Sequence, residues 1–260
     1  MEQSTKLQDL KINGSGSAGG GHFQNVSING SGKINGDVEC VQLKIDGSGK
    51  VEGNVKAESI KISGSSSLKG AIDAHKVKIN GSTKLEDQVT AQELTVNGSA
   101  KMLKDVKVSQ LTINGSGKVL GKISSERIEV NGLLTAEGNC EAEFFRSNGV
   151  IQVGGLLSAD DIQINVEHIS KVKEIGGEKI TVSNEKSFNL FRRLFQFLKS
   201  DPCLHTEVIE GDNIQLDFTK AKLVRGNHIT IGENCEIGTI EYTGTLEVHP
   251  KASVHASVKV

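Results

Sequence analysis

The sequence predicts an all-β protein, specifically a parallel β-helix in which short strands stack coil upon coil with a 17-residue period. Two observations carry this prediction: glycines recur at a fixed spacing, and apolar residues follow the same period in pairs that lie two positions apart. With 30 glycines and an aromatic content of only 3%, the composition alone resembles that of a disordered chain. The regular placement of the apolar residues argues against disorder.

The main glycine series runs through seven equal steps without an insertion: Gly30, Gly47, Gly64, Gly81, Gly98, Gly115, Gly132 and Gly149. Gly14 lies one position closer to Gly30 than this period requires, and it indicates an imperfect first coil. Asn precedes most of these glycines, so we expect Asn-Gly corners, where either residue accepts a positive φ. Stacking would also align the Asn side chains, and we expect them to hydrogen-bond from coil to coil.

The apolar residues form columns with the same period. One column reads Val26, Leu43, Ile60, Val77, Leu94, Leu111, Ile128 and Phe145, and another, of small residues, reads Cys40, Ala57, Ala74, Ala91 and Val108. Polar residues alternate with the apolar ones inside each repeat, which is typical of short strands with one buried face. A hairpin meander could use the same Asn-Gly pairs, but a constant period favours a solenoid of stacked repeats. We expect a right-handed triangular coil, because the thirds of the repeat differ too much for a left-handed hexapeptide helix.

The chain is expected to divide into four segments: an irregular N-terminal coil over 1–28, the main β-helix over 29–182, a helical insertion over 183–208 and C-terminal β-coils over 209–260. After the insertion we expect strands to resume at Asn213 and to provide one or two further coils. The tail from Val254 to Val260 alternates and is expected to be the last strand.

The insertion is predicted to contain an amphipathic α-helix near 187–200. Its apolar stripe recurs at helical spacing and its polar face is basic, and the candidate interaction residues are Phe188, Phe191, Arg192, Arg193, Phe195 and Leu198. Three interpretations stay open: the helix docks on the β-helix, binds a partner or a second copy, or lies on a membrane surface.

Composition and motifs argue against several functions. A net charge of −2 gives no reason to expect nucleic acid as a partner. No two of the four cysteines have C-x-x-C spacing, and Cys40 and Cys140 fall in inward columns as small core residues. No spacing suggests a nucleophile with a paired base, so we expect no catalytic residue, metal site or cofactor. Met1 to Lys11 is polar and lacks a signal-like apolar run, so we expect a soluble, cytoplasmic protein.

The repeat Ser-Gly-Lys-Ile-Asn-Gly-Asp-Val-Glu-Cys-Val-Gln-Leu-Lys-Ile-Asp-Gly (31–47) resembles the repeat of the bactofilins, bacterial polymer-forming cytoskeletal proteins. The segment 226–238 is similar in style, and the resemblance covers 10–165 well and 209–260 loosely. It implies a right-handed β-helix that assembles end to end without nucleotide. It also implies scaffolds in cell shape, division or appendage assembly, often at the inner membrane face, with other bactofilin-like or membrane-associated proteins as partners. The near absence of proline and the polar start depart from the family pattern, and they leave association with a membrane surface open.

The leading hypothesis is therefore a structural homopolymer. The ends of a β-helix leave backbone groups unpaired, and the candidate residues at such an end are Val254, Val258 and Val260. Two alternatives belong to other classes: a β-helical acyltransferase or polysaccharide-acting enzyme, and a monomeric adaptor that binds partners through the Phe-rich helix.

Overall fold

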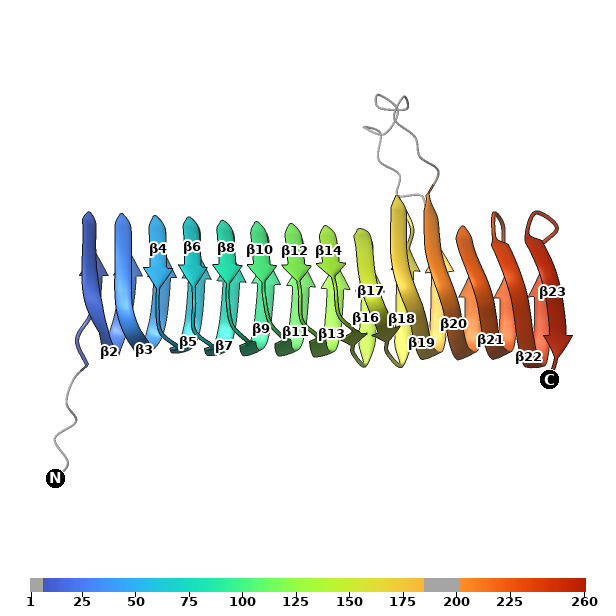
Figure 1. Cartoon of the computed structure of the whole chain (residues 1–260), viewed down its shortest axis with the longest axis horizontal. Coiled ribbons are helices and arrows are strands. Elements are labelled where there is room, and N and C mark those ends of the chain that lie inside the picture. Colours follow the sequence, from blue (N-terminus) through green and yellow to red (C-terminus); the bar gives the residue numbers. More distant parts are fainter. Residues whose placement is uncertain (1–6, 185–201) are drawn as a thin grey trace, which may run out of the picture. The chain divides into compact units, whose positions relative to one another are not determined.

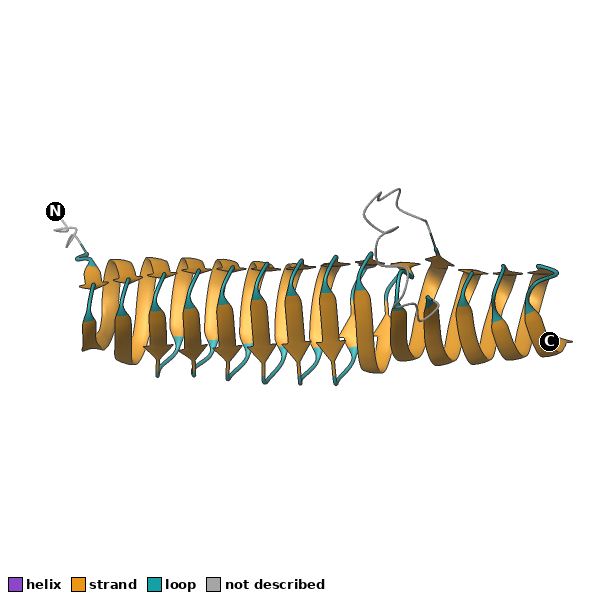
Figure 2. Cartoon of the chain, turned by 90° about the horizontal axis from the view of Figure 1, so that it is seen from above, coloured by secondary structure: helices purple, strands orange, loops and turns teal. Residues whose placement is uncertain are grey.

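A computed structural model describes residues 7–184 and 202–260. The strands pair in parallel, and they stack as successive coils of a β-solenoid (Figures 1 and 2). The predicted fold class is thus confirmed. The chain forms two compact units, residues 1–126 and 127–260. The helix predicted near 187–200 lies outside the described residues.

In the first unit, long and short strands alternate along the chain from β3 onward. Its strands are β1 (Leu10–Ile12), β2 (Ser15–Ile28), β3 (Ser31–Ile45), β4 (Ser48–Val51), β5 (Val55–Ile62), β6 (Ser65–Leu68), β7 (Ile72–Ile79), β8 (Ser82–Leu85), β9 (Val89–Val96), β10 (Ser99–Met102), β11 (Val106–Ile113) and β12 (Ser116–Val119). The boundary between the two units falls inside β13 (Ile123–Val130).

Each regular coil of the first unit has three sides, as the coil of residues 48–64 illustrates. Side A is the short strand β4. The long strand β5 supplies side B (55–57) and side C (59–62), because its pairing skips Glu58, which breaks the inward alternation and turns the chain. Val55 and Ala57 therefore face inward before this bend, and Ile60 and Ile62 face inward after it.

The predicted columns form the core of the first unit. Strand pairing places Ile45, Ile62 and Ile79 directly above one another, and all three are fully buried. The small column is almost as well buried: Cys40, Ala57 and Ala74 are each 6–7% exposed. Burying one large aliphatic side chain contributes about 1.5–3 kcal/mol, but a single coil offers it no partner. Stability therefore comes from contacts between neighbouring coils.

The corner glycines are required for a reason that the sequence analysis did not identify. We expected positive φ at the Asn-Gly corners of the main glycine series, but among the described glycines positive φ occurs only at Gly21 and at Gly36, which follows Asn35 outside that series. An added Cβ at Gly64 or Gly81 would instead lie 1.9 Å from the carbonyl oxygen of the glycine one coil earlier. Close approach of stacked backbones, and not backbone conformation, excludes a side chain at these corners.

The Asn ladder is confirmed. The side-chain amide of Asn97 donates to the amide oxygen of Asn80 at 2.8 Å, and the amide of Asn114 donates to Asn97 at the same distance. In the second unit, Asn148 donates in the same way to Asn131 at 3.2 Å. Each amide acts as donor to one coil and can act as acceptor from the next, so the ladder extends as long as the coils stay in register.

The second unit continues the same coil type with a less regular register. Its strands after β13 are β14 (Leu133–Ala136), β15 (Cys140–Glu141), β16 (Phe144–Ser147), β17 (Val150–Ser158), β18 (Asp161–Asn165), β19 (Ile169–Ser183), β20 (Cys203–Leu216), β21 (Thr219–Ile231), β22 (Glu236–Val248) and β23 (Ser253–Lys259). Strand β20 begins at Cys203, well before the start expected at Asn213, and β20 to β23 supply more coils than the one or two expected.

The coil length in the second unit varies, yet inward residues keep their columns. The spacing between stacked residues is 17 for Phe145/Ile162, 19 for Val153/Val172, 15 for Leu204/Thr219 and 17 for Ile229/Leu246. The step from Ile169 to Cys203 is much longer, because it includes the segment 185–201. Extra residues are accommodated at turns and at a bulge between Val153 and Leu156.

Replacing Gly81 by Ala should lower the free energy of unfolding by about 1–3 kcal/mol, because the new Cβ forces two stacked backbones apart. Urea denaturation followed by circular dichroism measures this change. Gly19→Ala is the matched control, since nothing lies within 4 Å of a Cβ at Gly19; its effect should stay within about 0.5 kcal/mol. Equal losses in both variants would contradict the close-approach explanation.

Candidate assembly surfaces

The last coil of the second unit leaves part of a strand uncovered. Strand β23 pairs with the first part of β22, from Glu236 to Tyr242. Among the described residues, no strand pairs with the outer edge of 245–248, although Leu246 and Val248 continue the core column above Ile229 and Ile231. Val248 is consequently 45% exposed, whereas Ile231 one coil earlier is fully buried. This edge combines apolar side chains with backbone groups that can pair with a further strand.

The three residues predicted at a polymer end all lie on or next to β23 (Figure 1). Val254 stacks on the buried Ile237 and is half-buried. Val258 stacks on Glu241 and is 50% exposed, and the backbone N–H of Val260 donates to the carbonyl oxygen of Tyr242 at 3.0 Å. The sequence analysis missed Val248, although the repeat spacing from Ile231 placed it in the core column.

The first coil of the first unit is less apolar. Its side A is formed by small residues of β2, from Ser15 to Gly19, which are mostly exposed. Leu7 is 44% exposed. Leu10 is half-buried, and its strand β1 pairs with β2. Small side chains leave little apolar area for another copy to bury, so the apolar surface is larger at the last coil of the second unit.

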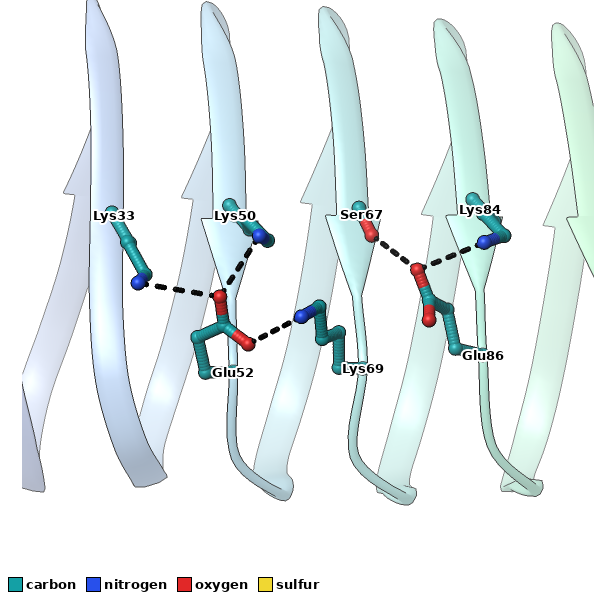
Figure 3. A network of polar contacts seen from close by, with 7 residues as sticks. All are labelled: Lys33, Lys50, Glu52, Ser67, Lys69, Lys84 and Glu86. Carbon is teal, nitrogen blue, oxygen red and sulfur yellow. Dashed lines mark hydrogen bonds and ion pairs between the residues drawn. The ribbon is translucent and has the colours of Figure 1, made fainter.

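Charged side chains tie successive coils of the first unit together (Figure 3). The Glu52 carboxylate accepts ion pairs from Lys69 at 2.8 Å, Lys50 at 2.9 Å and Lys33 at 3.3 Å, which belong to three successive coils. Hydrogen bonds from Lys69 and Lys50 lower the pKa of Glu52 to about 2. Glu86 in a later coil pairs with Lys84 at 3.0 Å. This network is exposed, so its contribution is sensitive to salt.

The four cysteines are free thiols and all are buried. Burial raises the pKa of Cys40 to about 11 and that of Cys140 to about 12. A thiol with so high a pKa is a poor nucleophile at neutral pH. Within 7–184 and 202–260, no group of three or more His, Cys, Asp or Glu side chains is arranged to hold a metal ion.

Other sites expected from the sequence fall outside this description. The candidate interaction residues of the insertion are not among the described residues: Phe188, Phe191, Arg192, Arg193, Phe195 and Leu198.

In the part of the chain that is described, no helix has the length and hydrophobicity to span a bilayer. Phe144 is an exposed aromatic residue that the sequence analysis did not single out; the guanidinium of Arg127 lies 4.7 Å from its ring centroid.

These features define a parallel β-solenoid whose last coil has an uncovered apolar edge. Residues 8–107 match the bactofilin family, described as polymer-forming cytoskeletal proteins. This match confirms, for residues 8–107, the resemblance noted in the sequence. The matched residues lie within the first unit.

Two curated relatives are similar to this chain over 109 and 107 residues. The uncharacterized protein YhbE of Bacillus subtilis strain 168 is 41% identical over 109 residues, which is 42% of this chain and 44% of that protein. The uncharacterized protein YhbF of the same strain is 39% identical over 107 residues, 41% of this chain and 42% of that protein. The match thus spans less than half of either relative. No solved structure matches the chain significantly.

The Glu52 network predicts a pH dependence. Its pKa in the folded protein is lowered from 4.5 to about 2, so the stability it contributes is present above pH 4.5 and is lost as the pH falls through about 2. Glu52→Gln should therefore be less stable than the wild type at pH 7, and this difference should shrink as the pH falls through that window. Urea denaturation across this range measures the difference.

Glu58→Gln provides the control for this experiment, because the exposed Glu58 has no ion-pair partner among the described residues. Its stability should follow that of the wild type at every pH. A gap between wild type and Glu52→Gln that stays constant to the acid end of the range would show that the carboxylate charge is not responsible.

Proposed function

We propose that this chain is a structural protein that assembles without nucleotide into cytoskeletal filaments or scaffolds. The observation that carries the proposal is the uncovered apolar edge at Val248, where the core column reaches the end of the described coils. A parallel strand edge of this kind pairs readily with another chain. The match of residues 8–107 to polymer-forming cytoskeletal proteins supports the same assembly.

The contact between copies would bury the side chains that the last coil exposes. Val248 and Val258 are about half exposed, and burying the exposed halves of both side chains contributes about 1.5–3 kcal/mol in apolar transfer energy. Backbone pairing along 245–248 would fix the register of the added coil. We place this proposal ahead of an acyltransferase, a polysaccharide-acting enzyme or an adaptor, because those alternatives do not use this surface.

The site of action is also part of the proposal. We place the polymer in the cytoplasm, at the inner membrane face when membrane-associated proteins recruit it. Four reduced, buried cysteines fit a reducing compartment. Cell shape, division or appendage assembly are the processes served by such scaffolds, and other bactofilin-like proteins are the expected partners besides the chain itself. Phe188 and Phe191 in the insertion remain the proposed contact for such partners.

Electron microscopy of the purified full chain without nucleotide or metal tests the proposal. The wild type should form filaments, and Val248→Asp combined with Val258→Asp should raise the protein concentration needed for assembly at least about tenfold, since a buried carboxylate without a partner is costly.

Leu133→Asp is the matched control, because Leu133 is 37% exposed but belongs to an inner coil of the second unit. This variant should assemble as the wild type does. Single particles of the wild type at every concentration, or equal inhibition by the control, would refute assembly through the last coil.

A further inference from the structure

Charge is distributed unevenly between the two units. Residues 1–126 contain 16 Lys and Arg against 13 Asp and Glu, whereas residues 127–260 contain 14 against 19. The net charge of −2 for the whole chain conceals this difference. Opposite excesses on two folded units favour contacts between different copies of the chain, provided that each excess is gathered on a surface.

In the first unit part of the positive charge lies in a lysine ladder on side C, formed by Lys44, Lys61 and Lys78. Strand pairing stacks these residues directly on one another, in three successive coils. Lys44 pairs with Asp46 at 2.6 Å. Lys61 and Lys78 are exposed, and no carboxylate of the described residues lies within ion-pair distance of either, although the charge of Lys61 still acts on Asp46. Like charges in adjacent strands repel, so this ladder gains from an external negative charge.

In the second unit the negative charge surrounds a groove of about 720 Å³. The floor is a stack of three glycines in register, Gly177, Gly211 and Gly226. A Cβ at Gly211 would lie 2.3 Å from the carbonyl oxygen of Gly177, and one at Gly226 would lie 2.4 Å from that of Gly211. These three stacked residues have no side chains, so this part of the groove leaves room for side chains from outside.

The groove carries an excess of carboxylates. The acidic residues that line it are Glu174, Glu178, Glu210, Asp212 and Glu241. Arg225 is the single cationic residue in the described lining, and it is held between Glu241 at 2.7 Å and Glu210 at 3.4 Å. Glu178 and Asp212 are exposed and have no ion-pair partner within the described residues.

We propose that the lysine ladder of one copy docks side by side into the acidic groove of a second copy. The two surfaces share one repeat, because coils in both units stack at the strand spacing of about 4.8 Å. Lysines from successive coils can therefore meet carboxylates from successive coils without losing register. The flexible lysine stem fits a groove whose floor has no side chains. This lateral contact joins solenoids side by side, and it does not use Val248, although Val260 lies at both the groove and the proposed end contact.

Every sample in the test is the full chain carrying Val248→Asp, which weakens the proposed end contact; this protein without further changes is the parent. Analytical ultracentrifugation measures its lateral association. A ladder variant carries Lys61→Glu and Lys78→Glu, and a groove variant carries Glu178→Lys and Asp212→Lys. None of these four residues has an ion-pair partner inside the described chain, so the changes should leave the fold intact.

Each variant alone should associate at least about tenfold more weakly than the parent at low salt, since two ion pairs are replaced by repulsive pairs. An equimolar mixture of the two variants should recover association to within about threefold, because the reversed ladder of one now meets the reversed groove of the other. Sodium chloride at about 1 M, where screening acts within about 3 Å, should abolish association of the parent.

Lys104→Glu combined with Lys107→Glu is the matched control, because both are exposed lysines of the first unit outside the ladder and change the net charge equally. This control should associate like the parent. The proposal is overturned if the control is weakened as much as the ladder variant, if the mixture fails to recover, or if the parent does not associate at low salt. If the ladder test fails while the wild type still forms filaments, the lateral contact is overturned and the proposed end contact is not affected.

Discussion

The stacking of one backbone directly on the next is the constraint on which the whole structure depends. Each coil must present its N–H and C=O groups to its neighbours at the parallel strand spacing. This requirement removes side chains wherever two turns meet most closely, as at Gly64 and Gly81, where a Cβ would lie 1.9 Å from a backbone oxygen. Once the spacing is fixed, every side chain lies above its equivalent one period earlier. Core columns, the Asn ladder and the charge network are consequences of that alignment.

The same alignment explains why the last described coil exposes apolar side chains. An inner coil buries its apolar residues against two neighbours, as Ile62 does between Ile45 and Ile79. The last described coil has one neighbour only, so Val248 stays half exposed although it occupies the same kind of position. Along the flanks, repetition places Lys44, Lys61 and Lys78 above one another and aligns three glycines along the groove. Assembly through the last described coil would extend the repeat that folds the chain, whereas the lateral contact would join solenoids side by side.

Much of this architecture could be predicted from the sequence, because a strict period is visible without a structure. The inward columns through Ile45 and Ile62 and the ladder through Asn97 follow from the spacing alone. The role of the corner glycines could not be predicted, since both positive φ and close backbone approach demand glycine and only the backbone geometry distinguishes them. The drift of the register after Val153 was also hidden, because bulges and turns absorb one or two residues without changing which side chains face inward.

The assembly surfaces were predicted less completely than the fold. Alternation in the tail predicted Val254, Val258 and Val260 as a polymer end, which stays a prediction. Val248 was overlooked because its exposure depends on where β23 pairs with β22, which the sequence does not show. The acidic groove depends on residues from several coils with unequal lengths, from Glu174 to Glu241, so no fixed spacing connects them in the sequence. The 17-residue period does connect Lys44, Lys61 and Lys78 in the sequence. A partner surface for these lysines can be proposed only once the acidic groove is known.

The most direct measurement of the central claim is fibre diffraction from aligned filaments of the wild-type chain, assembled without nucleotide. If the coils of one copy continue into those of the next, the strand spacing must lie along the filament axis. The account predicts a meridional reflection near about 4.8 Å. The same reflection on the equator would mean that the solenoids lie across the filament, and it would contradict assembly through the ends.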